Sequence, residues 1–331
     1  MKNLKTTKVK GNNSLFWRKI KKNESISKHT TLGIGGSAKY FVEVVKVDDL
    51  KKVVVECKKN RLEYFVIGGG SDILASDEGY DGMLILNNIS YIRKEDENRF
   101  ICGSGTILQD FINFVIGKGY AGLEKMSGIP GTVGGAIYGN AGAYGQTISD
   151  HIIKVIAFDG VKKKVYSVDE CCFDYRSSIF KKNKFIIIEA EFVFEKGEKE
   201  FLQKISLDTI QLRAQKYFSG IRCPGSYFKN VVVDKLTPRV LKLIPRDKIT
   251  YGKIPAGFLL ESVGAKGATK GDVKIADHHG NLIINNGNAT AKDFLELANR
   301  YAVKVERKFH IELEPEVQFL GFKNHENRKN K

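Results

Sequence analysis

The stretch that decides the fold reads G-I-P-G-T-V-G-G-A-I-Y-G-N-A-G-A-Y-G and runs from Gly128 to Gly145. Seven of its eighteen residues are glycine, which loses more conformational freedom than any other residue in regular structure. We therefore expect neither an ordinary helix nor an ordinary strand here. Such a run brings main-chain N–H groups close to a phosphate or a flat ring, although a packing loop between strands would also use glycine. Apolar residues are interleaved and should be buried: Ile129, Val133, Ile137, Tyr138 and Tyr144.

A second glycine run, Gly68-Gly69-Gly70-Ser71-Asp72, follows residues 64–67, which are typical of a buried strand. A strand followed by three glycines and a hydroxyl residue indicates a phosphate cradle. The spacing matches neither the dinucleotide fingerprint G-x-G-x-x-G nor a P-loop. Two glycine-rich segments about sixty residues apart predict a large nucleotide cofactor lying between them.

The composition is that of a soluble globular protein with two or three domains, since 42% of the 331 residues are hydrophobic and 28% are charged. The net charge is +16, with lysine far more frequent than arginine. The lysines are scattered and no basic–aromatic interleaving is visible, so we expect a solvated lysine-rich surface and no nucleic-acid partner.

Cysteine usage favours a reducing, cytoplasmic location, because the five cysteines are odd in number and contain no C-x-x-C pair. The first 28 residues are basic and polar without the apolar core of a secretory signal, and no run is long enough for a membrane-spanning helix. Asp277-His278-His279 has no third ligand at a suitable spacing, so no metal is expected.

Hydrophobic periodicity predicts a β-α-β unit made of a strand at 40–45, a helix capped by Asp48 and the strand at 64–67. A second helix should be capped by Thr106 and end at Gly117 and Gly119. The other expected elements are strands at 82–86, 100–102, 185–194 and 309–320, a hairpin of 152–158 and 164–168 around Asp159-Gly160, and helices at 199–218, 256–264 and after Thr290.

Five segments in a fixed order carry a resemblance to a known family. They are I-G-G-G-S-D at 67–72, the glycine-rich run at 128–145, Y-R-S-S-I-F-K at 175–181, G-S-Y-F-K-N at 225–230 and L-E-P-E-V at 313–317. In this order and spacing, the chain resembles the UDP-N-acetylenolpyruvoylglucosamine reductases (MurB) over about residues 29–320. It is similar to their shorter branch, which lacks an additional tyrosine loop.

The resemblance implies an α+β fold, the FAD-binding fold of the vanillyl-alcohol oxidase and p-cresol methylhydroxylase type, followed by a C-terminal α+β substrate-binding domain. The expected division is a flexible basic segment at 1–28, the FAD-binding domain at 29–202 with subdomains at 29–88 and 89–202, the substrate domain at 203–320, and a polar tail at 321–331.

The implied activity is NADPH-dependent reduction, through FAD, of UDP-N-acetyl-3-O-(1-carboxyvinyl)-glucosamine to UDP-N-acetylmuramate. This reaction serves cytoplasmic peptidoglycan synthesis, and through it cell-wall biogenesis, cell shape and cell division. The implied partner is the UDP-sugar enolpyruvyl ether, with no nucleic acid and no membrane insertion, and the protein would be a monomer or a weak oligomer.

The resemblance also implies catalytic roles for Arg176, Ser226 and Glu316. Arg176 would bind the carboxylate and stabilise enolate-like charge, a protonated Glu316 would assist it, and Ser226 would donate the proton, with a cation such as Lys229 supporting the alkoxide. Without the resemblance, a surface ion pair would be the better interpretation of Arg176, and Ser226 could be a simple turn residue and Glu316 a solvated strand carboxylate. Tyr144, Lys229 and Asn230 would contact substrate. The implied cofactor-binding residues are Ile67, Gly68, Gly69, Gly70, Ser71, Asp72, Gly128, Ile129, Pro130, Gly131, Gly134, Gly135, Ala136, Asn140, Ala141 and Gly142.

Two departures from the family pattern bear on the site. Asp72 stands where the family usually has asparagine, which adds a negative charge beside the cofactor pyrophosphate unless the side chain faces away or is paired. Residues 217–224 replace the usual Q-P-x-x-x-P-S-A stretch. Two other functions stay open: a flavin oxidase or dehydrogenase of the same fold acting on a sugar or lactone, and a non-catalytic nucleotide-binding module.

Overall fold

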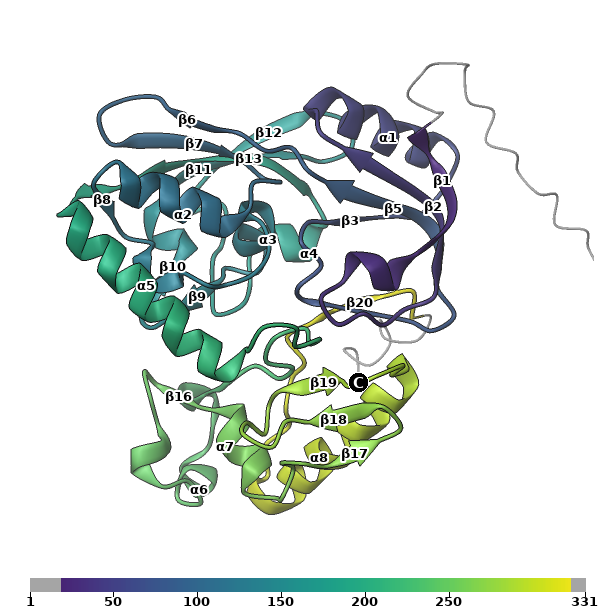
Figure 1. Cartoon of the computed structure of the whole chain (residues 1–331), viewed down its shortest axis with the longest axis vertical. Coiled ribbons are helices and arrows are strands. Elements are labelled where there is room, and N and C mark those ends of the chain that lie inside the picture. Colours follow the sequence, from purple (N-terminus) through teal and green to yellow (C-terminus); the bar gives the residue numbers. More distant parts are fainter. Residues whose placement is uncertain (1–18, 323–331) are drawn as a thin grey trace, which may run out of the picture.

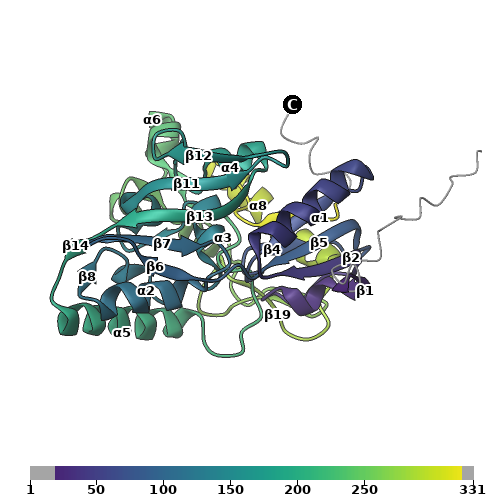
Figure 2. The ribbon, with the colours of Figure 1, turned by 90° about the horizontal axis from the view of Figure 1, so that it is seen from above.

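The structure, a computed structural model, describes residues 19–322. Figure 1 shows three units, two of them side by side and the third below them, and Figure 2 shows the first two from above. Most of the expected N-terminal segment (1–28) and of the expected polar tail (321–331) lies outside the described residues. The prediction of a flexible segment up to residue 28 is wrong at its C-terminal end, since Lys21–Ser25 form strand β1 and Ile26 is fully buried.

The first unit is a four-stranded sheet in the order β1-β2-β5-β3, in which β2, β5 and β3 are parallel. The bounds of its remaining strands are Ser37–Val44 (β2), Tyr64–Ile67 (β3) and Tyr80–Asn87 (β5). Helix α1 (Val47–Lys59) packs its predicted apolar face against this sheet. Asp48 is not its cap, since Lys46 holds that position. Asp48 lies instead in the first turn, where a carboxylate still favours the helix.

The second unit is a five-stranded antiparallel sheet in the order β12-β11-β13-β7-β6. Its strands are Ile92–Lys94 (β6), Arg99–Gly103 (β7), Ile152–Phe158 (β11), Lys163–Ser167 (β12) and Ile186–Val193 (β13). Helices α2 (Leu108–Gly117) and α5 (Lys199–Lys216) lie on one face of this sheet (Figure 2). The short helix α4 is Ile179–Asn183, and Tyr120–Ala121 (β8) pairs with Glu195–Lys196 (β14).

The predicted hairpin around Asp159 is confirmed, and the Asp159 carboxylate accepts the N–H groups of Val161 and Lys162. The predicted cap of α2 is wrong. This helix begins after Ile107, and the Thr106 hydroxyl is engaged by the main chain of Tyr91.

The central glycine run contains a helix, contrary to the expectation from its composition. Residues 133–138 form α3 (Val133–Tyr138), and the Thr132 hydroxyl accepts the Gly135 N–H at its start. Packing outweighs the intrinsic cost of glycine here, because Val133 and Ile137 are fully buried. Tyr144 was expected to be buried but is 44% exposed. It forms, with Gly145, the turn between Gly142–Ala143 (β9) and Gln146–Thr147 (β10), and both turn residues have positive φ, as a type I′ turn requires.

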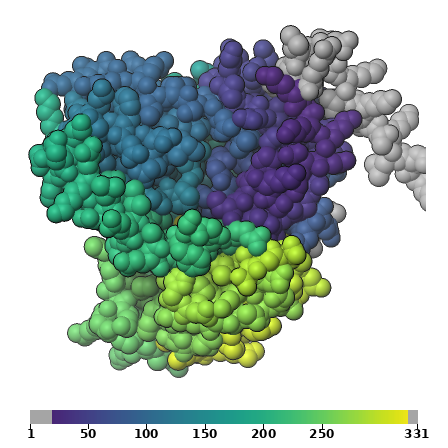
Figure 3. Space-filling model, viewed as in Figure 1, coloured from purple at the N-terminus to yellow at the C-terminus, as the bar shows by residue number. Residues whose placement is uncertain are grey.

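The third unit packs Ala256–Glu261 (α7) and Ala291–Phe309 (α8) with a small antiparallel sheet in the order β17-β18-β19. Its other elements are Val231–Val232 (β15), Pro238–Leu241 (α6), Lys253–Ile254 (β16), Thr269–Lys270 (β17), Val273–Ile275 (β18) and Ile283–Asn285 (β19). The predicted cap at Thr290 is confirmed, since its hydroxyl accepts the Asp293 N–H. Figure 3 shows this unit meeting the other two below α5.

The strand expected at 309–320 is wrong for most of its length. Helix α8 includes Phe309 and ends where His310 adopts a left-handed conformation, and only Gln318–Leu320 (β20) forms a strand. β20 pairs in parallel with Ile73–Ala75 (β4), which directly follows the first glycine run. The end of the described chain therefore returns to the first unit beside Asp72. No helix within residues 19–322 is long and apolar enough to cross a membrane.

Candidate functional site

The two glycine runs touch each other directly. A Cβ atom placed on Gly69 would lie 2.8 Å from the Cα of Gly131, and the Ser71 hydroxyl donates to the Pro130 carbonyl at 3.2 Å. The runs are therefore in contact at these residues, and a cofactor lying between the rest of the two runs stays a prediction. A ligand bound here would lie across the joined edge of the two loops.

Free main-chain donors in the described part of the chain are found in the first run and at Gly131 and Thr132 of the second run. Within the described residues, the N–H groups of Gly69, Gly70 and Ser71 have no acceptor in the protein. In contrast, the N–H groups of residues 133–136 all donate to main-chain or hydroxyl oxygens. The Asn140 Oδ1 atom is buried without a partner. Three adjacent free donors and an unpartnered buried amide fit a phosphate-bearing cofactor.

The predicted cofactor-binding residues differ in how accessible they are to a ligand. The Ile67 side chain is buried in the first unit, so only its main chain is left for a ligand. Four of them are exposed, namely Gly69, Gly128, Pro130 and Gly135, whereas Gly70 and Ala136 are buried.

Asp72 belongs to a cluster of charged side chains. Its burial, followed by the negative charge of Glu316, raises its pKa well above the usual range, while Lys181, Arg176 and Lys229 act in the opposite direction. Burial lowers the pKa of Lys181, and the charge of Asp72 partly offsets that effect. The Asp72 carboxyl is thus influenced by three cations and by one other carboxylate.

Arg176 and Glu316 form an ion pair, with Arg176 Nε 2.6 Å from Glu316 Oε1. The Nε–H bond is not aimed at this oxygen, so the contact is ionic in character and not a well-aligned hydrogen bond. The Arg176 Nη2 group donates to the Gly142 carbonyl at 3.2 Å, and the Arg176 backbone has a positive φ of 54°. The arginine thus links the central run to the last part of the chain.

Ser226 lies on the segment that pairs with the residues around Glu316. The Glu316 N–H donates to the Tyr227 carbonyl at 2.8 Å, and the Lys229 N–H donates to the Glu314 carbonyl at 2.9 Å. Because Ser226 precedes Tyr227, the predicted serine, carboxylate and guanidinium lie on adjoining segments. The fold brings together three residues that are far apart in the sequence.

The side-chain partners of Ser226 differ from those expected. The Ser226 hydroxyl lies 3.1 Å from Lys216 Nζ and 3.3 Å from the Tyr217 hydroxyl. Lys229 Nζ instead pairs with Glu314 at 2.7 Å, and no contact between Lys229 and Ser226 occurs in the described part of the chain. Sequence reasoning missed Lys216 and Tyr217, although Tyr217 opens the stretch that departs from the family pattern. Lys181 ends the motif at 175–181, but no role was predicted for it.

Comparison with known proteins agrees with this arrangement. A family model described as the C-terminal domain of UDP-N-acetylenolpyruvoylglucosamine reductase matches residues 215–320, and one described as an FAD binding domain matches residues 38–160. A UDP-N-acetylenolpyruvoylglucosamine reductase of Solibacter usitatus is 39% identical over 297 residues, which cover 89% of this chain and 95% of that protein. One from Bacillus subtilis is 33% identical over 309 residues, covering 92% and 94%.

A crystal structure of the reductase from Thermus caldophilus superimposes with a TM-score of 0.71 at 30% identity, covering 89% of this chain and 97% of that one. The chain belongs to the UDP-N-acetylenolpyruvoylglucosamine reductase family. As expected, its fold is the α+β FAD-binding fold followed by a C-terminal domain.

The two family-model matches together include the glycine runs and the segments that carry Ser226 and Glu316. Both glycine runs fall within the FAD-binding match, and Ser226, Lys216 and Glu316 fall within the C-terminal match. Arg176 lies between the two matched ranges and is tied to both by its contacts with Gly142 and Glu316.

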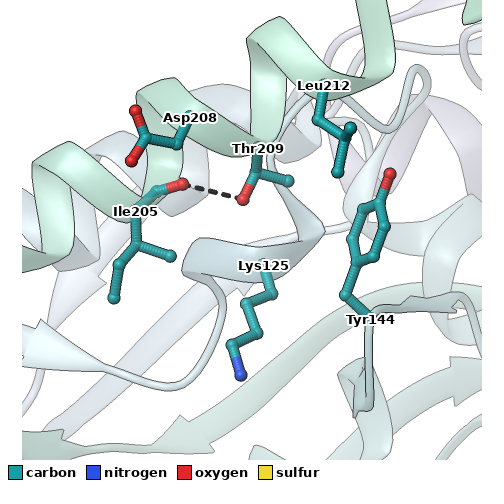
Figure 4. Close-up of a pocket in the computed structure, with 6 residues that line it drawn as sticks. All are labelled: Lys125, Tyr144, Ile205, Asp208, Thr209 and Leu212. Carbon is teal, nitrogen blue, oxygen red and sulfur yellow. Dashed lines mark hydrogen bonds between the residues drawn. The ribbon is translucent and has the colours of Figure 1, made fainter.

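The residues expected to contact substrate occupy two places. Asn230 Oδ1 accepts the Ala256 N–H at the start of α7, and the Asn230 N–H donates to the Tyr175 hydroxyl. Tyr144 lines a shallow pocket between the β9–β10 turn and α5, and Figure 4 shows its ring reaching toward Leu212. The other lining residues are Lys125, Ile205, Asp208 and Thr209. No group of three His, Cys, Asp or Glu side chains within residues 19–322 is placed to hold a metal ion.

Proposed function

We propose that this protein reduces the enolpyruvyl ether of UDP-N-acetylglucosamine to UDP-N-acetylmuramate, with FAD as its bound redox group and NADPH as the electron donor. One observation carries the proposal. In a chain of this reductase family, Arg176, Glu316 and Ser226 lie on adjoining segments beside the joined glycine loops.

The cofactor would be held by the first glycine run. The free N–H groups of Gly69, Gly70 and Ser71 are suited to its pyrophosphate, and Gly131 allows the second run to approach closely. We infer that the other residues expected at the cofactor contribute main chain and shape. When bound, FAD supplies the hydride that the vinyl carbon of the substrate accepts.

Arg176 would bind the substrate carboxylate and stabilise the negative charge that develops on the adjoining carbon. A guanidinium stays charged at any physiological pH and matches a carboxylate with paired N–H donors. Glu316 holds this side chain at its Nε edge, which leaves Nη1 for the substrate. Through this ion pair Glu316 would keep the guanidinium positioned toward the developing enolate.

Ser226 would donate the proton that completes the reduction. A serine hydroxyl is a weak acid, but the carbanion beside a carboxylate is far more basic, so the transfer runs downhill. The O–H bond of Ser226 breaks, a C–H bond forms at the carbon bearing the carboxylate, and the serine oxygen is left with negative charge.

The remaining assignments are also proposals. We infer that Tyr144, Lys229 and Asn230 contact the sugar nucleotide and that the third unit, from about residue 203, serves as the substrate domain. A nucleotide-linked sugar and NADPH place the reaction in the cytoplasm, in peptidoglycan precursor synthesis. We also infer a monomer or a weak oligomer.

The test is a product assay with purified protein, FAD and NADPH. With the enolpyruvyl UDP-sugar, NADPH should be oxidised one-for-one and the nucleotide product should gain the mass of two hydrogens. Consumption of oxygen with sugar lactones, and no reaction with the enolpyruvyl nucleotide, would point to an oxidase and overturn the proposal.

A further inference from the structure

The Ser226 hydroxyl is contacted by two side chains from the end of α5. The Lys216 ammonium donates to Ser226 Oγ at 3.1 Å, and the Tyr217 hydroxyl lies 3.3 Å from the same oxygen. Lys216 is the last residue of α5, and Tyr217 follows it. A positive charge in contact with the proton donor lowers the energy of the alkoxide that proton transfer leaves behind.

The end of α5 is held firmly in place. The Tyr217 N–H donates to the Arg213 carbonyl at 2.8 Å, and two cations contact the Tyr217 ring, with Lys216 Nζ 5.0 Å and Arg213 Cζ 5.2 Å from its centre. The Lys216 carbonyl lies 2.9 Å from His278 Nε2. Because a carbonyl only accepts, this histidine nitrogen carries the hydrogen. The motif Asp277-His278-His279 thus supports the lysine beside Ser226.

The other cations of the site are occupied elsewhere. Arg176 is paired with Glu316, Lys229 with Glu314, and Lys181 Nζ lies 3.5 Å from the Arg176 carbonyl. Lys216 forms no ion pair among the described residues, so its charge is directed at the serine.

Several ionisable groups face Lys216 and must be counted in any pH dependence. His278 and Tyr217 contact it directly. Burial, followed by the charge of Lys216, lowers the pKa of His279 to about 4, so His279 is neutral at physiological pH. Burial raises the pKa of Cys223, against a smaller opposing effect of Lys216, so its thiol also stays neutral.

We propose that Lys216 is the positioning residue that makes Ser226 an effective acid and restores its proton, with Tyr217 fixing the geometry of the pair. This inference rests on the proposed function. After Ser226 gives its proton to the substrate carbon, an N–H bond of the Lys216 ammonium breaks and the serine O–H bond forms again. The neutral amine then takes a proton from solvent, so no other reactant is needed.

The experiment compares Lys216→Met, Lys216→Arg and Tyr217→Phe with the control Lys204→Met, which removes an exposed lysine from the same helix. The FAD-loaded protein is reduced with NADPH, mixed with the enolpyruvyl nucleotide without oxygen, and followed by flavin absorbance. Calorimetry on the oxidised proteins measures nucleotide affinity separately, and circular dichroism shows whether each variant is folded.

Lys216→Met should slow reoxidation at saturating nucleotide about 100-fold, the range expected for loss of proton-transfer assistance. Lys216→Arg should recover only the part of the rate that depends on the positive charge beside Ser226, because the guanidinium keeps that charge but does not give up a proton. For the same reason the alkaline limb of the pH profile should shift upward. Lys204→Met should match the parent protein.

Two outcomes overturn the inference without touching the proposed function. In one, Lys216→Met weakens calorimetric affinity but leaves the saturating rate unchanged, which would make Lys216 only a ligand for the nucleotide. In the other, Lys216→Arg and Lys216→Met lose rate equally with unchanged pH profiles. If the nucleotide fails to reoxidise the parent protein, it is the proposed function that is wrong.

Discussion

Arg176 Nε lies 2.6 Å from Glu316 Oε1, and this ion pair joins the FAD-binding half of the chain to the segment that precedes its last strand. Both side chains are about a quarter exposed, at 23% and 22%. The pair therefore stands at a surface that a ligand can reach. Strand β20 pairs with β4, which directly follows the first glycine run. Because Glu316 lies two residues before β20, this pairing also fixes where Glu316 lies relative to that run.

Arg176→Lys should slow reoxidation of reduced flavin by the nucleotide about 100- to 1,000-fold, the usual cost of losing a preorganised charge contact. A lysine cannot make the paired contact with a carboxylate. Stopped-flow absorbance measures the rate, and the protein should stay yellow. Arg93→Lys is the matched control, because Arg93 is exposed and remote from the glycine runs. A colourless Arg176→Lys protein would show that Arg176 is needed for FAD binding, which contradicts the role proposed for it.

Ser226→Ala should leave flavin reduction by NADPH nearly intact while slowing reoxidation by the nucleotide at least 100-fold, because only the second step needs the proton. Ser219→Ala removes a nearby exposed hydroxyl and should behave as the parent. Separate single-turnover measurements of the two steps decide the matter. Equal losses in both steps would argue that Ser226 has no role as the acid.

Gly69→Ala should lower the affinity for FAD and cost about 1–3 kcal/mol of stability. The added methyl group would stand 2.8 Å from the Cα of Gly131 and force the two loops apart. Gly117→Ala is the control, since nothing lies within 4 Å of a Cβ at that position at the end of α2. Flavin titration and thermal unfolding measure both effects, and equal behaviour of the two variants would contradict the loop contact.

Asp72→Asn should raise the melting temperature by a few degrees at pH 8 and change it little at pH 3. Burial raises the pKa of Asp72 above its ordinary value of 3.8, so the unfolded carboxyl ionises first as the pH rises. Stability is therefore full below that value and falls as the pH rises through the native pKa. Asp169→Asn, at an exposed position, should show no such trend. A variant destabilised more at pH 8 than at pH 3 would reverse the sign and refute the assignment.

Regular periodicity made much of the fold predictable. The apolar face of α1, the hairpin around Asp159 and the start of α8 at Thr290 all follow from local chemistry. Strand β1 was missed because the sequence Lys21–Ser25 is polar and owes its conformation to pairing with β2. Helix α3 was missed because its glycines are unfavourable alone and tolerated only under tight packing against residues such as Ser104.

Only those site residues that lie within the family motifs could be predicted from the sequence. Arg176, Ser226 and Glu316 lie in quoted motifs, and the structure places them on adjoining segments. Lys216 could not be found in this way, because its role depends on where α5 ends relative to Ser226. That relation is set by tertiary packing, and no spacing in the sequence encodes it.

The most direct test of the central claim is a visible spectrum of the FAD-loaded protein, recorded without oxygen before and after one equivalent of NADPH and again after the enolpyruvyl UDP-sugar. The protein should be yellow, NADPH should bleach it, and the nucleotide should turn it yellow again with formation of UDP-N-acetylmuramate. A protein that binds no flavin, or one that stays bleached until oxygen is admitted, would contradict it.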